Sequence, residues 1–149
     1  MYECLTDANR IRAFTQADSR FDKSAGGEFS MFGGSISGTN VELVEEAKIV
    51  QKWRFRYRMK LFSAPKSCFS FPLSTKSSWF LHSNWAEGVF SNVTITIEEP
   101  NAGSTIVKLK QTGVPEADGY GNQNVYETTE RGWRENVFQR IRMVFGFGV

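Results

Sequence analysis

The segment VFSNVTITIEEPNAGSTIVKLKQ, residues 89–111, decides the fold. Its first half alternates Val93, Ile95 and Ile97 with polar side chains, which is the pattern of a strand with one buried face. The turn signal Pro100–Gly103 separates this run from a second alternating run over residues 104–111. The segment therefore predicts an antiparallel hairpin.

Further alternating segments lie upstream of this hairpin, at residues 27–32, 35–43 and 48–55. The glycine pair Gly33-Gly34 separates the first two segments and favours a tight connection between them. The third segment places a row of large or amide side chains on one face, namely Ile49, Gln51, Trp53 and Phe55. Together these segments predict about five antiparallel strands joined by short connections.

Helical patterns stand at both ends of the chain. Residues 1–14 have helical spacing, and the polar cluster at residues 6–9 can cap a second turn that starts near Ala8. Near the C-terminus, Thr128 or Thr129 is the expected cap of a helix of about 17 residues, or about 25 Å. Its apolar stripe comprises Trp133, Val137, Phe138, Ile141, Val144 and Phe145, and Gly146 and Gly148 are expected to end it. The sequence predicts an α+β fold, a curved antiparallel sheet packed on a long C-terminal helix.

Composition narrows the function classes. The length of 149 residues suggests a single domain spanning 1–149. Hydrophobic residues make up 40% of the chain and charged residues 23%, and this balance argues against wholesale disorder. The net charge of +2 is too small to imply nucleic acid by itself. The interleaved basic and aromatic residues 53–60 are interpreted as a core strand that runs into a basic loop. No nucleic-acid partner is therefore expected.

Cysteine and histidine are scarce. The two cysteines, Cys4 and Cys68, exclude a disulfide framework and a four-thiolate zinc site, and the single His82 excludes a two-histidine metal site. Cys4 is expected to be a small core residue. There is no long apolar run and no signal-peptide pattern, so a protein of a reducing compartment, the cytosol or the nucleus, without a membrane partner is expected.

Catalytic motifs are also missing from the sequence. It has no nucleophile elbow and no glycine-rich phosphate loop. The pairs Glu45-Glu46 and Glu98-Glu99 are adjacent near strand ends, where neighbouring side chains point to opposite faces, so neither pair forms a close carboxylate couple. The sequence predicts no catalytic residue, no cofactor and no metal, and the protein is not expected to be an enzyme.

A curved sheet on one helix can enclose an apolar cavity. This leaves open an alternative function, the carriage of a small apolar ligand between sheet and helix. The residues expected to line such a cavity, or simply to fill the core, are Phe29, Phe32, Trp53, Phe90, Trp133, Val137, Ile141 and Phe145.

Residues 56–82 do not fit the pattern around them. The segment is basic and serine-rich, contains no acidic residue and shows no sustained period, yet it stands between two strong strand patterns. Most connections of this kind are only a few residues long. We expect an inserted and disordered loop.

Eight short motifs occur in a characteristic order along the chain. They are LTDANR (5–10), GGEF (26–29), GSISG (34–38), KWRF (52–55), WAEG (85–88), QTGVP (111–115), ERGW (130–133) and VFGFG (144–148). In this order and spacing they resemble the C-terminal domain of the activators of the heat-shock protein 90 (Hsp90) ATPase, above all its plant members. The resemblance covers nearly everything except residues 56–82, and it implies a helix-grip fold of the START-like, Bet v-like superfamily.

The resemblance also implies a function. Family members are co-chaperones that bind the Hsp90 dimer in the cytosol and speed its ATP hydrolysis by favouring its closed state, which assists protein folding and the stress response. In full-length members an N-terminal domain grips the middle segment of the chaperone, and the C-terminal domain contacts its dimerised N-terminal domains. The expected contact surface here is the loop 113–124 with exposed parts of the last helix. Its candidate residues are Gly113, Val114, Pro115, Arg131 and Arg134.

The sequence departs from the family pattern at two places. The family domain has a strand before its first helix, whereas Met1 falls inside that helix here, so we expect a partial domain with an unpaired sheet edge. The family pattern also runs straight from KWRF (52–55) to SNWAEG (83–88), so residues 56–82 are additional. They are interpreted as a retained intron or a gene-model error, and a non-functional splice variant is a further alternative.

Overall fold

The computed structural model describes residues 1–55 and 85–147 of the chain. The predictions made for residues 56–82, with those for Cys68, His82 and Gly148, lie outside the described residues. Among the residues described, no helix is long and apolar enough to cross a membrane.

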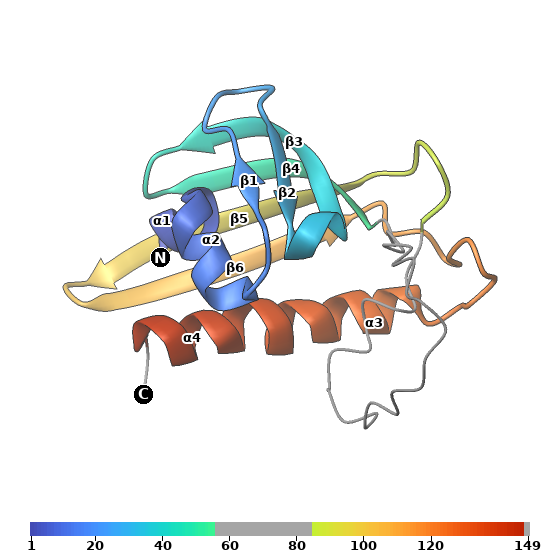
Figure 1. The fold of residues 1–149 in the computed structure, drawn as a ribbon. Coiled ribbons are helices and arrows are strands. Elements are labelled where there is room, and N and C mark those ends of the chain that lie inside the picture. Colours follow the sequence, from blue (N-terminus) through green and yellow to red (C-terminus); the bar gives the residue numbers. More distant parts are fainter. Residues whose placement is uncertain (56–84, 148–149) are drawn as a thin grey trace, which may run out of the picture.

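A six-stranded antiparallel sheet forms the frame of the fold, with its strands side by side in chain order (Figure 1). The strands are β1 (Arg20–Phe21), β2 (Glu28–Met31), β3 (Ile36–Val44), β4 (Lys48–Phe55), β5 (Ser91–Asn101) and β6 (Ser104–Thr112). The predicted strand segments are confirmed, including the β5–β6 hairpin. The two-residue strand β1 was not predicted, because it is too short to show a period.

The register explains why alternation in the sequence predicts burial. Ile49 lies opposite Ile95, and Gln51 lies opposite Val93. All four of these side chains are buried, together with Trp53 and Phe55 of the same row on β4. The concave face of the sheet is thus the inner face that the pattern predicted.

Gly38 on β3 allows a close approach between strands. A side chain at this position would collide with the backbone oxygen of Lys52 on β4 and with the ring of Phe29 on β2. Glycine therefore lets the Phe29 ring lie across β3 toward the core.

The N-terminal helical segment consists of two helices, α1 (Tyr2–Thr6) and α2 (Ala8–Thr15). Asp7 separates them with extended backbone angles, and its carboxylate accepts hydrogen bonds from the backbone N–H groups of Asn9 and Arg10 at 3.0 and 2.9 Å. The predicted second start near Ala8 is confirmed, and the reason is this N-terminal cap.

The C-terminal helix runs for 21 residues. It comprises α3 (Val125–Arg131), one π-helical stretch η3 (Gly132–Phe138) and α4 (Gln139–Phe145). The prediction that Thr128 or Thr129 caps the helix was wrong, because the helix begins at Val125. The Thr129 hydroxyl donates to the Val125 carbonyl at 2.7 Å and so belongs to the helix interior. Gly146 ends the helix as expected, in the left-handed region at φ 69°.

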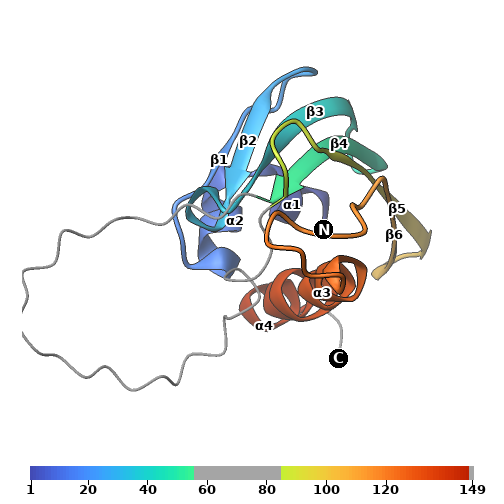
Figure 2. The ribbon, with the colours of Figure 1, turned by 90° about the vertical axis from the view of Figure 1, so that its right-hand side faces the viewer.

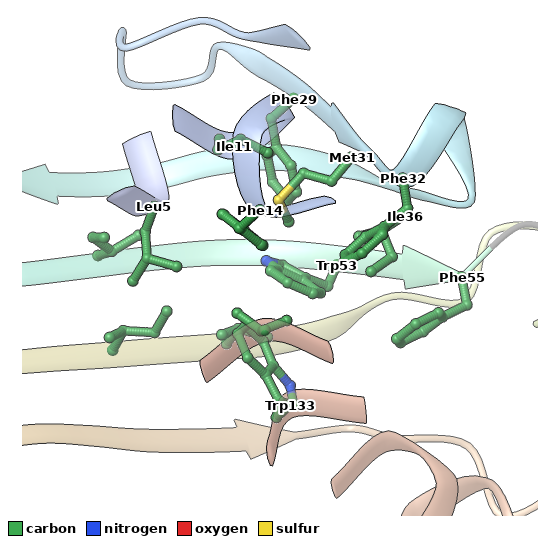
Figure 3. Close-up of a cluster of buried hydrophobic side chains, with 14 of the residues drawn as sticks. Leu5, Ile11, Phe14, Phe29, Met31, Phe32, Ile36, Trp53, Phe55 and Trp133 are labelled. Atoms are coloured by element: carbon green, nitrogen blue, oxygen red, sulfur yellow. The ribbon is translucent and has the colours of Figure 1, made fainter. Parts of the chain in front are cut away.

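Helices α1, α2 and the C-terminal helix all lie within the curve of the sheet (Figures 1 and 2). The side chains between them form one apolar cluster, in which the rings of Phe29, Trp53 and Trp133 follow one another (Figure 3). This arrangement confirms the predicted helix-grip α+β fold. The loops at the ends of the strands lie outside this cluster (Figure 1).

Candidate functional site

The loop 113–124 joins β6 to the C-terminal helix at one end of the sheet, beside the segment that leads into β5 (Figures 1 and 2). Asp118 organises it from a buried position. Its carboxylate accepts hydrogen bonds from the backbone N–H groups of Tyr120 and Asn122, both at 2.9 Å, and from the Asn122 amide at 2.9 Å. Backbone bonds between Asp118 and Asn122 and from Gly121 to Asp118 close the turn. The loop is therefore a shaped surface.

The charge of Asp118 is part of this arrangement. Burial acts to raise the pKa of its carboxyl group, but the hydrogen bonds from Asn122, Tyr120 and Gly121 outweigh burial and hold the pKa below its ordinary value. Asp118 is therefore ionised at neutral pH and keeps its acceptors available for the loop.

Aromatic side chains are exposed around this end of the molecule. Tyr120 at the tip of the loop is 61% exposed, Tyr126 in the first turn of α3 is 66% exposed, and Phe90 just before β5 is 45% exposed. The backbone of Gly113 passes close to Phe90, since a side chain on Gly113 would lie 3.6 Å from the Phe90 carbonyl oxygen. Exposed aromatic residues on an ordered loop suit recognition of another protein.

The predicted contact residues fall in two places. The loop begins with Gly113, Val114 and Pro115. Gly113 has a backbone φ angle of 75°, and the side chains of Val114 and Pro115 are half-buried. Arg131 and Arg134 are exposed on the C-terminal helix, and Arg134 forms an ion pair with Glu130 at 2.8 Å. Sequence reasoning missed Asp118 and Tyr120, although an aspartate followed by Gly119 and Gly121 is typical of a turn held by the aspartate side chain.

The space between β4 and the C-terminal helix is filled by side chains. The Trp53 and Trp133 rings lie 4.4 Å apart between β4 and the helix. Most of the residues considered as lining for a cavity are buried in this core, namely Phe29, Phe32, Trp53, Trp133, Val137 and Ile141. Phe145 is half-buried, and Phe90 is exposed at the far end of the sheet, so the structure does not bring it to the others.

Two chains of hydrogen bonds, one buried and one part-buried, provide partners for the indole N–H groups of Trp53 and Trp133. The Trp53 indole N–H donates to Gln51 at 2.7 Å, and Gln51 in turn donates to Asn40 at 2.7 Å. On the other side, the Trp133 indole N–H donates to Gln111 at 2.7 Å, and Gln111 donates to the Ser91 hydroxyl at 2.7 Å. The amides thus have partners within the protein and do not point at an unfilled ligand site.

A groove of about 870 Å³ lies outside this core, between β6 and the C-terminal helix. Its floor includes Val107, Leu109, Trp133 and Phe138, and Arg134 and Arg142 stand among its polar lining residues. Trp133 is the one candidate cavity residue that reaches this groove.

The acidic groups near the strand ends and the Cys4 thiol were considered in the sequence as candidates for chemistry, and the structure places them as follows. In the described part of the chain, no group of three or more histidine, cysteine, aspartate or glutamate residues could hold a metal ion. Glu98 is paired with Lys108 at 2.7 Å, and Glu99 accepts the Gly103 N–H at 2.9 Å. Cys4 is fully buried, as expected of a core residue.

The fold and the surfaces together define a helix-grip domain that exposes aromatic residues at its loop end. The chain belongs to the family described as Activator of Hsp90 ATPase homolog 1-like protein, whose model matches residues 1–146. It is 34% identical over 146 residues, or 98% of its length, to the activator of 90 kDa heat shock protein ATPase homolog of Dictyostelium discoideum. It is 29% identical over 115 residues, or 77% of its length, to homolog 1 of Homo sapiens. It spans 29% and 26% of the lengths of these two relatives.

Solved structures agree with this assignment. A crystal structure of an HSP90 activator from Plasmodium falciparum matches 99% of this chain and 86% of that chain, with a TM-score of 0.78 and 26% identity. CalU16 from Micromonospora echinospora matches 98% of this chain and 67% of that chain, with a TM-score of 0.58 and 17% identity, and so shares the fold.

Proposed function

We propose that this chain is a co-chaperone module that binds the Hsp90 dimer and stimulates its ATPase. The observation that carries the proposal is the family match over residues 1–146, joined to a structural match over 99% of the chain with an HSP90 activator. In this role the chain is an activator of another protein's catalysis and works in the cytosol, without a cofactor, a nucleic acid or a membrane.

The filled core supports this proposal over the carrier alternative. A carrier of a small apolar ligand needs space between sheet and helix, lined by converging polar groups. Here Trp53 and Trp133 occupy the part of that space beside β4, and Gln51 and Gln111 are satisfied by protein partners. The carrier remains the alternative to test in the groove beside β6.

The contact surface that we propose is the loop end of the domain. Asp118 holds the loop in one shape, and that shape presents Tyr120 to solvent beside Gly113, Val114 and Pro115. Arg131 and Arg134 add positive charge about 1.7 and 2.5 turns into the helix that begins at Val125. A rigid aromatic residue on an ordered loop is the kind of anchor that carries binding energy in protein interfaces.

Activation requires a preference for one state of the chaperone. A partner shifts a conformational equilibrium only by its difference in affinity for the two states. The module must therefore bind the closed Hsp90 dimer more tightly than the open one. A hundredfold shift in the ratio of closed to open dimer corresponds to about 2.7 kcal/mol of differential affinity.

Residues 56–82 are proposed to be an insertion into a single domain that spans residues 1–149. The flanking residues support this idea, because β4 ends at Phe55 and the Trp85 N–H donates to the Phe55 carbonyl at 3.2 Å. After the segment, the chain therefore returns to the end of β4. A deletion of residues 56–82 would keep both Phe55 and Trp85, and so would preserve this hydrogen bond.

The test measures the steady-state ATPase rate of purified Hsp90 with increasing amounts of three proteins: the intact chain, a chain lacking residues 56–82, and the intact chain with Tyr120→Ser. The proposal predicts saturable stimulation by the intact chain and weaker stimulation by the Tyr120 variant. Stimulation only after the deletion would mark the intact chain as a non-functional splice product. If every protein is folded and none stimulates the ATPase, the proposal is wrong, and binding of apolar dyes to the groove becomes the next assay.

A further inference from the structure

The convex face of the sheet carries two cations on its central strand. Trp53 and Phe55 of β4 are buried in the core, so their neighbours Lys52 and Arg54 project from the opposite, convex face. Lys52 is exposed and Arg54 is half-buried. Strands β3, β4 and β5 are each paired on both sides, so this part of the face lies in the interior of the sheet, away from its edges.

The side chains around the two cations are small and polar. Arg54 lies opposite Ser37 on β3, and Lys52 lies between Thr39 on β3 and Asn92 on β5. Residues opposite each other in an antiparallel pair share a face, and we call these five residues the basic band. None of them is acidic or aromatic, and the hydroxyl and amide groups can donate hydrogen bonds. The basic band is therefore a cationic surface rich in hydrogen-bond donors.

Lysines at the other end of the same face are neutralised. Lys48 on β4 forms an ion pair with Glu42 at 2.8 Å, and Lys108 on β6 forms one with Glu98 at 2.7 Å. Within residues 1–55 and 85–147, no ion pair involves either cation of the basic band. The basic band thus keeps its positive charge available for a partner.

The basic band adjoins the loop surface proposed for Hsp90. Asn92 of the band lies opposite Thr112 on β6, and Gly113, the first residue of the loop, follows Thr112 directly. The exposed Phe90 stands just before β5 begins, close to Asn92 in the chain. Figure 1 shows that β4 and β6 end, and β5 begins, at the same end of the sheet. A partner that contacts the loop can therefore extend over the basic band.

Charge complementarity selects the chemistry of that partner surface. Glu28 on β2 and Lys110 on β6 are exposed on either side of the basic band and carry opposite charges, so the two cations of the band set the sign of the surface. A single-stranded nucleic acid gains much of its affinity from aromatic side chains on which its bases stack, and the band has none. Carboxylates of a protein can use the cations and the neighbouring donors together.

We propose that acidic residues of Hsp90 dock on the basic band when the loop end of this domain is bound. This inference rests on the proposed function and adds to it the chemistry of the partner surface beside the loop contact. Lys52 and Arg54 then lie at the rim of the interface, with the loop nearer its centre. Charged groups at a rim mainly raise the association rate and make binding depend on salt.

The test is titration of Hsp90, in the presence of a non-hydrolysable ATP analogue, with the full chain and two variants that change the net charge equally. Lys52→Glu reverses a cation of the basic band, whereas Lys48→Glu, on the same strand and face, reverses one that Glu42 already pairs. The two positions are about 13 Å apart at about 3.3 Å per residue, beyond the Debye length of about 8 Å in 0.15 M salt.

We expect Lys52→Glu to weaken binding about fivefold or more, mainly by slowing association, and Lys48→Glu to stay within about twofold of wild type. Raising the salt concentration should weaken binding of the wild type more than binding of Lys52→Glu. Lys52→Gln, which only neutralises the charge, should fall between wild type and Lys52→Glu, and it replaces the reversal if circular dichroism shows that Lys52→Glu perturbs the fold.

The outcomes separate this inference from the proposed function. If the wild type binds Hsp90 and the Lys52 and Lys48 variants bind equally well, the inference is wrong and the proposed function stands. If the folded wild type does not bind Hsp90, both are wrong. Binding of a labelled single-stranded oligonucleotide to the wild type that is lost in Lys52→Glu would assign the basic band to nucleic acid and would also overturn the inference.

Discussion

The indole ring of Trp53 lies against that of Trp133, with ring centroids 4.4 Å apart and planes inclined by 33°. This contact joins the central strand β4 directly to the C-terminal helix. Each indole N–H is satisfied by a glutamine from the sheet, Gln51 for Trp53 and Gln111 for Trp133, both at 2.7 Å. The pair thus fastens the helix to the sheet through both stacking and hydrogen bonding.

Truncation of this pair should cost much of the stability of the domain. Trp133→Ala leaves a large cavity and leaves the side-chain carbonyl oxygen of Gln111 without its hydrogen-bond donor. We therefore expect the free energy of unfolding to fall by about 3–5 kcal/mol. Trp133→Phe keeps a ring but removes the donor, and about 1–3 kcal/mol is expected. Urea unfolding followed by fluorescence of the remaining tryptophans measures both. Val144→Ala, at a position that is 46% exposed, is the control and should change stability by less than about 0.5 kcal/mol.

Gly38 is predicted to tolerate no side chain. In Gly38→Ala the new methyl group meets the Lys52 backbone and the Phe29 ring, so β3 and β4 must separate. We expect a destabilisation of about 1–3 kcal/mol or more in chemical unfolding. The neighbouring Ser37→Ala, in the same strand and half-buried, should have little effect. Equal stability of the two variants would show that the strands can adjust at Gly38.

The loop should lose stability at acid pH through Asp118. Its pKa in the folded protein lies below the ordinary value near 3.9, so its stabilising contribution is fully present above that value and is lost as the pH falls through the folded pKa. Asp118→Asn removes the charge at nearly the same shape. The difference in unfolding free energy between wild type and Asp118→Asn should be largest near pH 7 and shrink below about pH 4. The exposed Glu116 provides the control, since Glu116→Gln should change the unfolding free energy at pH 7 by less than about 0.5 kcal/mol.

Tyr120 is predicted to contribute to binding rather than to stability. Because its side chain is 61% exposed, Tyr120→Ser should leave the unfolding free energy within about 0.5 kcal/mol of wild type. The affinity of the Tyr120→Ser variant for Hsp90 should nevertheless fall by about tenfold, because a tyrosine at the centre of an interface often contributes this much binding energy. Val41→Ser, at an exposed apolar position on β3, serves as the control and should bind like wild type. Equal affinities would move the contact surface away from the loop.

Local patterns predicted the parts of this fold that depend on local chemistry. Alternation around Val93 and Ile95 predicted the β5–β6 hairpin, and Asp7 and Gly146 marked helix ends because their caps are made within a few residues. The start of the last helix at Val125 escaped prediction, since Asn124 provides no side-chain cap there. The predicted Thr129 cap failed because that hydroxyl is used inside the helix.

The surfaces were harder to predict because they depend on contacts between distant residues. The composition of residues 113–124 predicted a loop, but the buried position of Asp118 follows from the packing around it. The groove exists only where β6 and the C-terminal helix approach each other, and Val107 and Phe138 show no signal of this in sequence. Phe90 was expected near the core, yet it lies before β5 begins and faces solvent.

The most direct test of the central claim is the affinity of the purified chain for Hsp90 with and without a non-hydrolysable ATP analogue, measured by pull-down and by titration. The account predicts tighter binding in the presence of the analogue, because an activator must prefer the closed dimer. Equal affinity in both conditions, or no binding by a chain shown to be folded, would contradict it.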